Sequence, residues 1–499
     1  MIRLALAALL LATPAAAQTV HLKQGDVTGV TQKQSTAWLG LPFAAPPVGD
    51  LRWKAPQPAA SWSGIRTADH FGTECRQGLS PNGLGPWTAE YQPKGPVGED
   101  CLYLNVWRPA APGKKLPVMV WIHGGAFTGG SGGVPIYNGA ALAAHGIIVV
   151  TLNYRVGVYG FLAHPDLTRE AGTSGNYGLM DQIAALKWVH DNIAAFGGDP
   201  ARVTLAGQSA GAASVHDLMM SPNATGLFRQ AIAESGSGIG SFMATRSDAE
   251  KTGEGLGTIA DLRRLDPEAL EALVAKSGAH FAPIVDGVVI PAEEPVNPVP
   301  ILTGITANET SSAGFLSPDT LTPDSFRTQV TATYGPLSAQ VLKLYPPSNS
   351  ADEAKASRDA LARDRGLAAM DLWAEKRLSH GGGPVYAYLW THVEPGPDAA
   401  RYKAFHSSEM PYVFGTLDTS TRPFTAVDRK LSVQATQWWA NWVKTGDPDG
   451  KGGLWRPFTL KTRSITVIDG KIVARPVLPP ETLKLFKAHV ANGGRVGIF

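Results

Sequence analysis

The chain has 499 residues, with 44 lysines and arginines against 42 acidic residues, so its formal net charge is only +2. This balance, without a dense basic block, argues against nucleic acid as a partner. The length exceeds what one ordinary core organises, yet enzymes built on a large open sheet reach this size as one domain with insertions.

The first residues have the pattern of a secretory signal peptide. Met1-Ile2-Arg3 precedes an apolar run over residues 4–12, and Ala15-Ala16-Ala17 supplies small residues before an expected cut after Ala17. A membrane anchor is the alternative, but an anchor needs about 18 consecutive apolar residues, and this run breaks at Thr13-Pro14. We expect export to the periplasm or the medium, with residues 18–499 forming a single soluble domain that has no membrane span.

The sequence contains two cysteines, Cys75 and Cys101. In an oxidising compartment a close pair is expected to form a disulfide, here closing a loop that contains Trp87 and Tyr91. Two free buried thiols are the alternative. Two cysteines without a matching histidine cluster also argue against a structural zinc site.

Short apolar segments recur along the chain and alternate with helical patterns. In the clearest helix, Asp181 to Phe196, apolar residues repeat every three to four positions until Gly197-Gly198 ends the pattern. This alternation predicts a mainly parallel sheet covered by helices on both faces. Residues 241–276 predict a helical cap inserted over the sheet. The expected strands are residues 102–107, 118–122, 147–152, 203–206, 299–303 and 385–390.

Two segments match the pattern Gly-x-Ser-x-Gly, around Ser131 and around Ser209. A nucleophile elbow needs a strand before the serine and a helix after it, because this arrangement exposes the hydroxyl at a tight turn. Ser209 follows a predicted strand and precedes a predicted helix over residues 212–220, whereas Ser131 lies in a glycine loop with neither. We therefore predict Ser209 as the nucleophile.

A serine nucleophile requires a base and an acid that orients the base, and in this type of elbow fold they follow in the order serine, acid, histidine. His406 lies in a loop of small residues, although a surface histidine is the alternative interpretation. Glu309 comes just after a predicted strand, where an acid belongs. Its rivals Asp286 and Glu293 precede that strand, so Glu309 is the predicted acid.

The segment Trp121 to Phe127 leaves a strand and opens into Gly124-Gly125-Ala126. Such a loop suits two exposed backbone N–H groups for an oxyanion, with a third from Ala210 after the nucleophile. A phosphate-binding loop is the alternative, but the lysine and hydroxyl of such a loop are missing.

From about Gly40 to Trp455, the chain resembles the type-B carboxylesterase and cholinesterase family. The motifs that carry the resemblance occur in the right order. They are residues 40–49 (GLPFAAPPVG), 99–107 (EDCLYLNVW), 153–157 (NYRVG), 175–182 (GNYGLMDQ), 196–200 (FGGDP), 207–211 (GQSAG), 234–237 (ESGS) and 439–448 (WANWVKTGDP).

This resemblance implies an α/β-hydrolase fold for residues 18–499, with a large, mostly parallel sheet. It implies a triad of Ser209, Glu309 and His406 without metal or cofactor, an oxyanion hole at Gly125, Ala126 and Ala210, and the Cys75–Cys101 disulfide. The chain departs from the family at three places. Gln208 replaces a common glutamate, Tyr91 stands where choline-specific members have tryptophan, and Ala126 replaces a glycine.

The predicted function is therefore hydrolysis of a small-molecule carboxylic ester through an acyl-enzyme. One alternative is an exported esterase specialised for a carbamate or a multi-ester toxin. Another is a binding protein that keeps the fold, although the complete triad argues against this.

Overall fold

The computed structural model describes residues 19–111, 113–236, 243–293, 298–315, 321–450 and 453–498. The predicted signal peptide, residues 1–17, lies outside this part of the chain. Within it, seven neighbouring strands of a 12-stranded sheet run parallel, and antiparallel strands flank them on both sides. The predicted mainly parallel sheet is confirmed.

The strand order places the carboxyl ends of β13, β14 and β17 side by side in the middle of the sheet. All six predicted segments are strands, and the other six strands of the sheet, including β14, were not predicted. The strands, in spatial order, are β21 (Lys471–Pro476), β20 (Ser464–Asp469), β18 (Val385–Trp390), β17 (Ile301–Thr306), β14 (Gln230–Glu234), β13 (Gly198–Gln208), β11 (Leu116–Ile122), β12 (Ile148–Leu152), β10 (Tyr103–Pro109), β4 (Ser35–Pro42) and β3 (Val30–Thr31), with β19 (Pro457–Phe458) paired to β18.

Strand β11 is buried on both faces, which explains its continuous apolar sequence. Val118, Val120 and Ile122 pack into one hydrophobic cluster, while Met119 and Trp121 pack into another. Successive side chains point to opposite faces of a strand, so this alternation assigns the two clusters to the two faces of the sheet.

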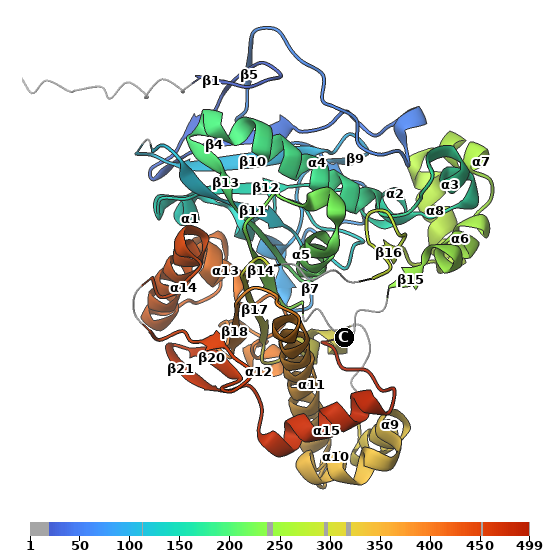
Figure 1. Ribbon diagram of the computed structural model, residues 1–499, viewed down its shortest axis with the longest axis vertical. Helices are drawn as coiled ribbons and strands as arrows, with labels where there is room; N and C mark the ends of the chain where they lie inside the picture. The colour runs from blue at the N-terminus through green and yellow to red at the C-terminus, as the bar shows by residue number, and fades with distance from the viewer. Residues whose placement is uncertain are drawn as a thin grey trace, which may run out of the picture.

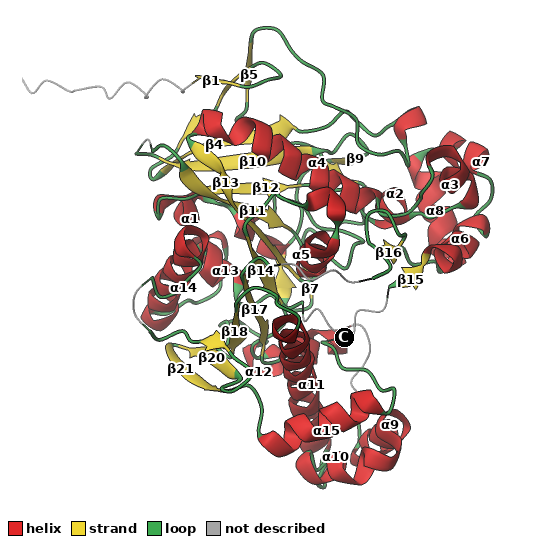
Figure 2. Cartoon of the chain, in the orientation of Figure 1, coloured by secondary structure: helices red, strands yellow, loops and turns green. Residues whose placement is uncertain are grey.

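Helices cover both faces of the sheet (Figures 1 and 2). Helices α4, α5 and α11 contribute to the first cluster and α1 and α14 to the second. The predicted helix at Asp181 begins earlier, at Tyr177, and its last turn is a 3-10 helix, Ile193–Phe196. The principal helices are α1 (Ala140–Ala144), α2 (Gly157–Phe161), α3 (Pro165–Ala171), α4 (Tyr177–Asn192), α5 (Ala210–Met220), α9 (Pro323–Tyr334), α10 (Ser338–Leu344), α11 (Ala351–Ser379), α12 (Ala399–Tyr402), α13 (Met410–Phe414), α14 (Ala426–Thr445) and α15 (Pro480–Ala491).

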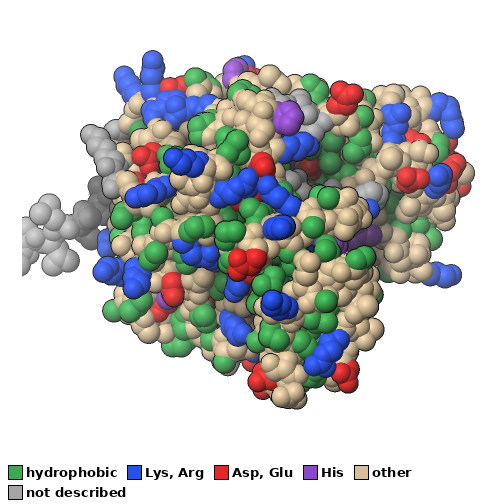
Figure 3. Space-filling view, turned by 60° about the horizontal axis from the view of Figure 1, so that its bottom comes forward, with side chains coloured by type: hydrophobic (Ala, Val, Ile, Leu, Met, Phe, Trp, Pro, Cys, Tyr) green, Lys and Arg blue, Asp and Glu red, His purple; other side chains and the backbone are tan. Residues whose placement is uncertain are grey.

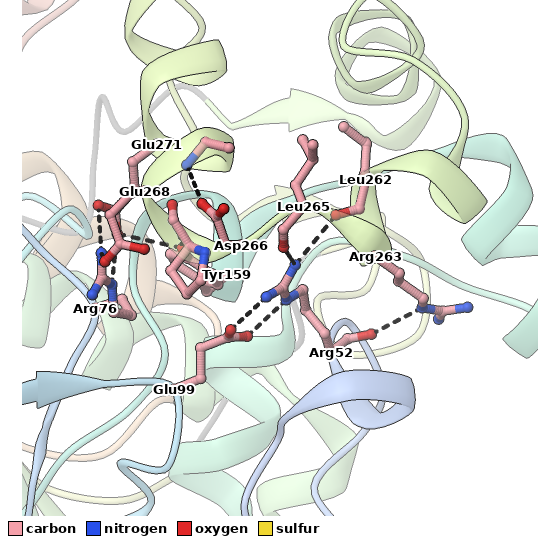
Figure 4. Close-up of polar contacts among 12 residues, drawn as sticks. Arg52, Arg76, Glu99, Tyr159, Leu262, Arg263, Leu265, Asp266, Glu268 and Glu271 are labelled. Atoms are coloured by element: carbon pink, nitrogen blue, oxygen red, sulfur yellow. Dashed lines mark hydrogen bonds and ion pairs between the residues drawn. The ribbon is translucent and has the colours of Figure 1, made fainter.

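The described part of the predicted helical cap, from residue 243, forms α6 (Arg246–Glu254), α7 (Ile259–Arg264) and α8 (Pro267–Ser277), and these helices lie to one side of the sheet and not over it. Figure 1 shows these helices beside α3, at one side of the molecule. Two arginines from the N-terminal part of the chain fasten the insertion, as Figure 4 shows. The guanidinium of Arg52 donates to the carboxylate of Glu99 and to a carbonyl oxygen at the C-terminal end of α7. Arg76 forms an ion pair with Glu271 on α8.

The surface mixes both signs of charge. On the face shown in Figure 3, basic and acidic side chains are scattered among apolar ones. No helix within the described residues is long and apolar enough to cross a membrane.

Candidate active site

Ser209 occupies the sharp turn between β13 and α5, which is the strand and helix context predicted for the elbow. Its backbone has φ 59° and ψ −124°, a conformation that L residues rarely adopt. The turn packs closely on β11, because a Cβ added to Gly211 would lie 2.1 Å from the carbonyl oxygen of Ile122. Small residues around the serine are therefore a steric requirement.

The other serine in a matching pattern, Ser131, has a structural role. Its side chain is buried, its hydroxyl donates to Asn153 Oδ1 at 3.2 Å, and its Oγ accepts from the N–H of Gly133 at 2.9 Å. Ser209, by contrast, is partly exposed.

Glu309 begins the 3-10 helix η6 (Glu309–Phe315) directly after β17, and its carboxylate is held from two sides. Its Oε1 accepts from the N–H of Thr306 at 2.7 Å and from the hydroxyl of Ser235 at 2.6 Å. Its Oε2 is hydrogen bonded to Nδ1 of His406. The structure thus brings the predicted acid and base together across 97 residues of chain.

The loops that carry this pair are joined by their backbones, since the N–H of Asn308 donates to the carbonyl of Ala404 at 3.0 Å. His406 is itself buried, and its Nε2 lies 3.1 Å from the side-chain nitrogen of Gln208, the residue just before Ser209. The loops that carry the three predicted residues therefore lie at the carboxyl edge of the sheet, where parallel sheets place their chemistry, with His406 bonded to Glu309 and facing the residue before Ser209.

The rival acids have other surroundings. Asp286 is buried and accepts the N–H groups of Val289 and Ile290 at 2.9 and 2.8 Å, and also the hydroxyl of Thr173 at 3.0 Å. Glu293 is exposed. Asp286 thus stabilises a turn.

The predicted oxyanion loop has three successive residues with positive φ, namely Gly125 at 115°, Ala126 at 54° and Phe127 at 61°. The loop is fixed by its carbonyls, because Gly125 accepts from Thr128 and Gly129, and Phe127 accepts from Gly157 at 2.6 Å. Among the described residues, the N–H groups of Gly125 and Ala126 have no backbone acceptor. The N–H of Ala210 opens α5, where helical N–H groups have no intrahelical acceptor.

The side chain of His123 packs against the start of this loop. Burial lowers its pKa to about 4, so the ring is neutral, and its Nδ1 lies 2.8 Å from the carbonyl oxygen of Gly124. The ring stacks on Tyr154, whose hydroxyl donates to the carbonyl of His123 at 3.1 Å. A neutral histidine in this place is a support for the loop and not a second base.

Two further carboxyls, Glu234 and Glu409, are fully buried, and Glu409 interacts electrostatically with both Glu234 and Glu309. Burial raises the pKa of Glu234 to about 8, and burial together with the neighbouring Glu234 raises that of Glu409 further above its usual range. Both shifts favour the protonated, uncharged form of these carboxyls, which limits the negative charge placed near Glu309.

The predicted disulfide between Cys75 and Cys101 is present. The loop that it closes reaches the candidate site, because the indole N–H of Trp87 donates to the carbonyl of His406 at 3.0 Å. The Trp87 ring stands edge-on to the imidazole, with the centroids 6.4 Å apart.

Sequence reasoning missed the hydrogen bonds of Ser235 and Trp87 with the site and the electrostatic influence of Glu409 on it. Ser235 follows β14, and recognising that strand would have placed this hydroxyl at the same sheet edge as Ser209. The roles of Trp87 and Glu409 depend on packing between distant segments and carry no local signal. Within the described residues, no cluster of three or more histidine, cysteine or acidic side chains is arranged to hold a metal ion.

The sheet, the elbow and the loops at its carboxyl edge define an α/β-hydrolase. The model of the family described as the Carboxylesterase family matches residues 16–476. The chain belongs to this family, and it is a carboxylic ester hydrolase.

The chain is similar to enzymes from bacteria and mammals. It is 37% identical to a fumonisin B1 esterase of Sphingopyxis macrogoltabida over 91% of this chain and 88% of that protein. It is 36% identical to a para-nitrobenzyl esterase of Bacillus subtilis over 95% and 99%, and 33% identical to a human cocaine esterase over 87% and 82%. A solved structure of a PNB esterase superposes with a TM-score of 0.78 at 33% identity, covering 94% of this chain and 99% of that one.

Proposed function

We propose that Ser209, His406 and Glu309 are the nucleophile, general base and orienting acid of this ester hydrolase. The observation that carries the proposal is the contact of His406 with both sides of the site. Its Nδ1 bonds Glu309, while its Nε2 faces the elbow residue Gln208 at 3.1 Å. An imidazole held at Nδ1 by a carboxylate keeps its proton there and presents the Nε2 lone pair as a base.

In the first half of the reaction, Ser209 Oγ forms a bond to the ester carbonyl carbon and its proton passes to His406 Nε2. The carbonyl π pair moves to the oxygen, and the N–H groups of Gly125, Ala126 and Ala210 stabilise the resulting anion. Collapse of this intermediate breaks the bond to the leaving oxygen, which takes the proton from Nε2 and departs as the alcohol.

In the second half, water attacks the acyl-enzyme and gives its proton to Nε2. Collapse breaks the bond to Ser209 Oγ, which recovers a proton from Nε2 as the carboxylic acid leaves. The resting site is restored, and no external oxidant or reductant takes part.

The test is hydrolysis of p-nitrophenyl acetate by the wild-type protein, Ser209→Ala and Ser131→Ala. We expect Ser209→Ala to lose at least about 10⁴-fold in kcat, as triad members typically do. Ser131→Ala is the matched control, because it removes the serine of the other matching pattern and should keep turnover. Substantial activity in folded Ser209→Ala would refute the nucleophile.

A specialised substrate is a second candidate, favoured by the similarity to the protein named fumonisin B1 esterase. We propose comparing kcat/KM for fumonisin B1, for a simple p-nitrophenyl ester and for a p-nitrophenyl carbamate. A preference of at least 100-fold for the toxin would support the specialised function. Preference for the simple ester would support a general esterase.

We also propose that the chain is exported to the periplasm or medium, with residues 18–499 forming one hydrolase domain. The pattern of residues 1–17 and the disulfide support this proposal, since disulfides persist in oxidising compartments. Mass spectrometry of the protein recovered outside the cytoplasm should give an N-terminus at Gln18. Recovery of uncleaved protein in the cytoplasm alone would refute export.

A further inference from the structure

The side-chain amide of Gln208 lies against the nitrogen of His406 that a general base uses. Gln208 ends β13, is only 2% exposed, and places its Nε2 at 3.1 Å from His406 Nε2. The other end of the amide faces the oxyanion loop, because a Cβ added to Gly124 would come within 3.0 Å of Gln208 Oε1. The amide is thus enclosed between the imidazole and the start of that loop.

The direction of the hydrogen bond follows from the other side of the ring. Glu309 accepts at Nδ1, so the neutral imidazole carries its proton there and has a lone pair at Nε2. The group of Gln208 that faces this lone pair is an NH₂ group, which donates to it. Such a bond exists only while Nε2 is unprotonated, and it therefore favours the neutral ring.

We propose that Gln208 is a positioning residue, which holds the Nε2 lone pair of His406 in the resting site and yields it to the Ser209 hydroxyl when an ester binds. The inference rests on the proposed triad. In this step Nε2 exchanges one donor for another, and the proton on Nδ1 stays in place. A glutamate at position 208 has no proton to donate to the lone pair and would instead favour the protonated ring.

Gln208 contacts only one of the two ring nitrogens of His406. Substitution there changes the Nε2 side and leaves the Nδ1 side with Glu309 intact. Within the described part of the chain, the charged or titratable groups around the ring include Glu309 at Nδ1, the buried carboxyls Glu234 and Glu409, and Arg422, which lies over the neighbouring Phe405 ring and pairs with Glu90 and Glu394. Trp87 contributes an uncharged ring edge.

The experiment compares the pH dependence of kcat/KM for p-nitrophenyl acetate in the wild type, Gln208→Met and Gln208→Glu. Methionine keeps the length but removes the donor, so the acid limb should move up by roughly 0.5 to 1 pH unit, the equivalent of one neutral hydrogen bond. Glutamate adds a charge beside Nε2 and should move the limb up by about 1 to 3 pH units. Gln182→Met is the matched control, because Gln182 is a buried amide on α4 that donates to Ser214.

An unchanged acid limb of the kcat/KM profile in Gln208→Met would overturn the proposal, even if the limb moves in Gln208→Glu. In that case His406 would respond to the added charge and not to the loss of the hydrogen bond. An equal shift in the Gln182→Met control would overturn it as well.

A second measurement does not depend on turnover. In a Ser209→Ala background, ¹⁵N NMR of the His406 ring should show protonation at higher pH when Gln208→Met is added, and an unchanged titration would refute the contact. An inactive wild type would refute the proposed function, whereas the NMR comparison would still decide the role of Gln208.

Discussion

Replacing Glu309 by glutamine should reverse the tautomer of the proposed base. Glutamine has one acceptor oxygen, and two donors already bind a single oxygen of Glu309, Oε1: the backbone N–H of Thr306 at 2.7 Å and the hydroxyl of Ser235 at 2.6 Å. The amide oxygen should therefore take the place of Oε1, which leaves the NH₂ group facing His406 Nδ1. The ring then accepts at Nδ1 and carries its proton on Nε2, where it cannot receive the serine proton.

The expected cost is about 10⁴-fold in kcat, or about 5.5 kcal/mol, the magnitude typical of an acid-to-amide change in a triad. The assay is turnover of p-nitrophenyl acetate at pH 7.5, with thermal unfolding to establish that the variant is folded. Asp286→Asn is the matched control, because Asp286 is also a buried carboxylate, but it accepts backbone N–H groups of the turn that follows it. We expect this control to lower stability and retain turnover. A folded Glu309→Gln enzyme within about ten-fold of the wild type would refute the reasoning.

Three further predictions concern the surroundings of the site. Trp87→Phe keeps a ring beside His406 but removes the indole donor, so kcat/KM should fall roughly five-fold, the value of one hydrogen bond, and an unchanged value would refute that role. Replacing Cys75 and Cys101 by serine should cost about 3 kcal/mol in the free energy of unfolding by urea, because it frees a loop with a sequence separation of 26 residues. Burial raises the pKa of Asp217 to about 7. The folded state therefore keeps a proton that the unfolded chain releases near its usual value of 3.8, and stability should fall by about 1.4 kcal/mol per pH unit as pH rises towards 7. Asp217→Asn should flatten this slope, and parallel unfolding profiles for the two proteins would contradict the assignment.

The sequence alone was enough to predict six strands of the sheet, its mainly parallel arrangement and the elbow. Strands such as β11 are buried on both faces, so their sequences are continuous apolar runs. Such runs can be recognised from the local sequence alone. The elbow is equally local, because Ser209 lies between a strand and a helix that are contiguous in the chain. The order of serine, acid and histidine then favoured Glu309 and His406 as the acid and the base.

The tertiary structure alone decided how the site is held together. The hydroxyl of Ser235 reaches Glu309 because β14 and β17 are neighbours in the sheet, and Trp87 reaches His406 across 319 residues. The contact of Gln208 with His406 spans 198 residues in the same way. Local propensity and periodicity describe segments one at a time. Hydrogen bonds between distant segments depend on how those segments pack, so their partners emerge only when the whole chain is folded.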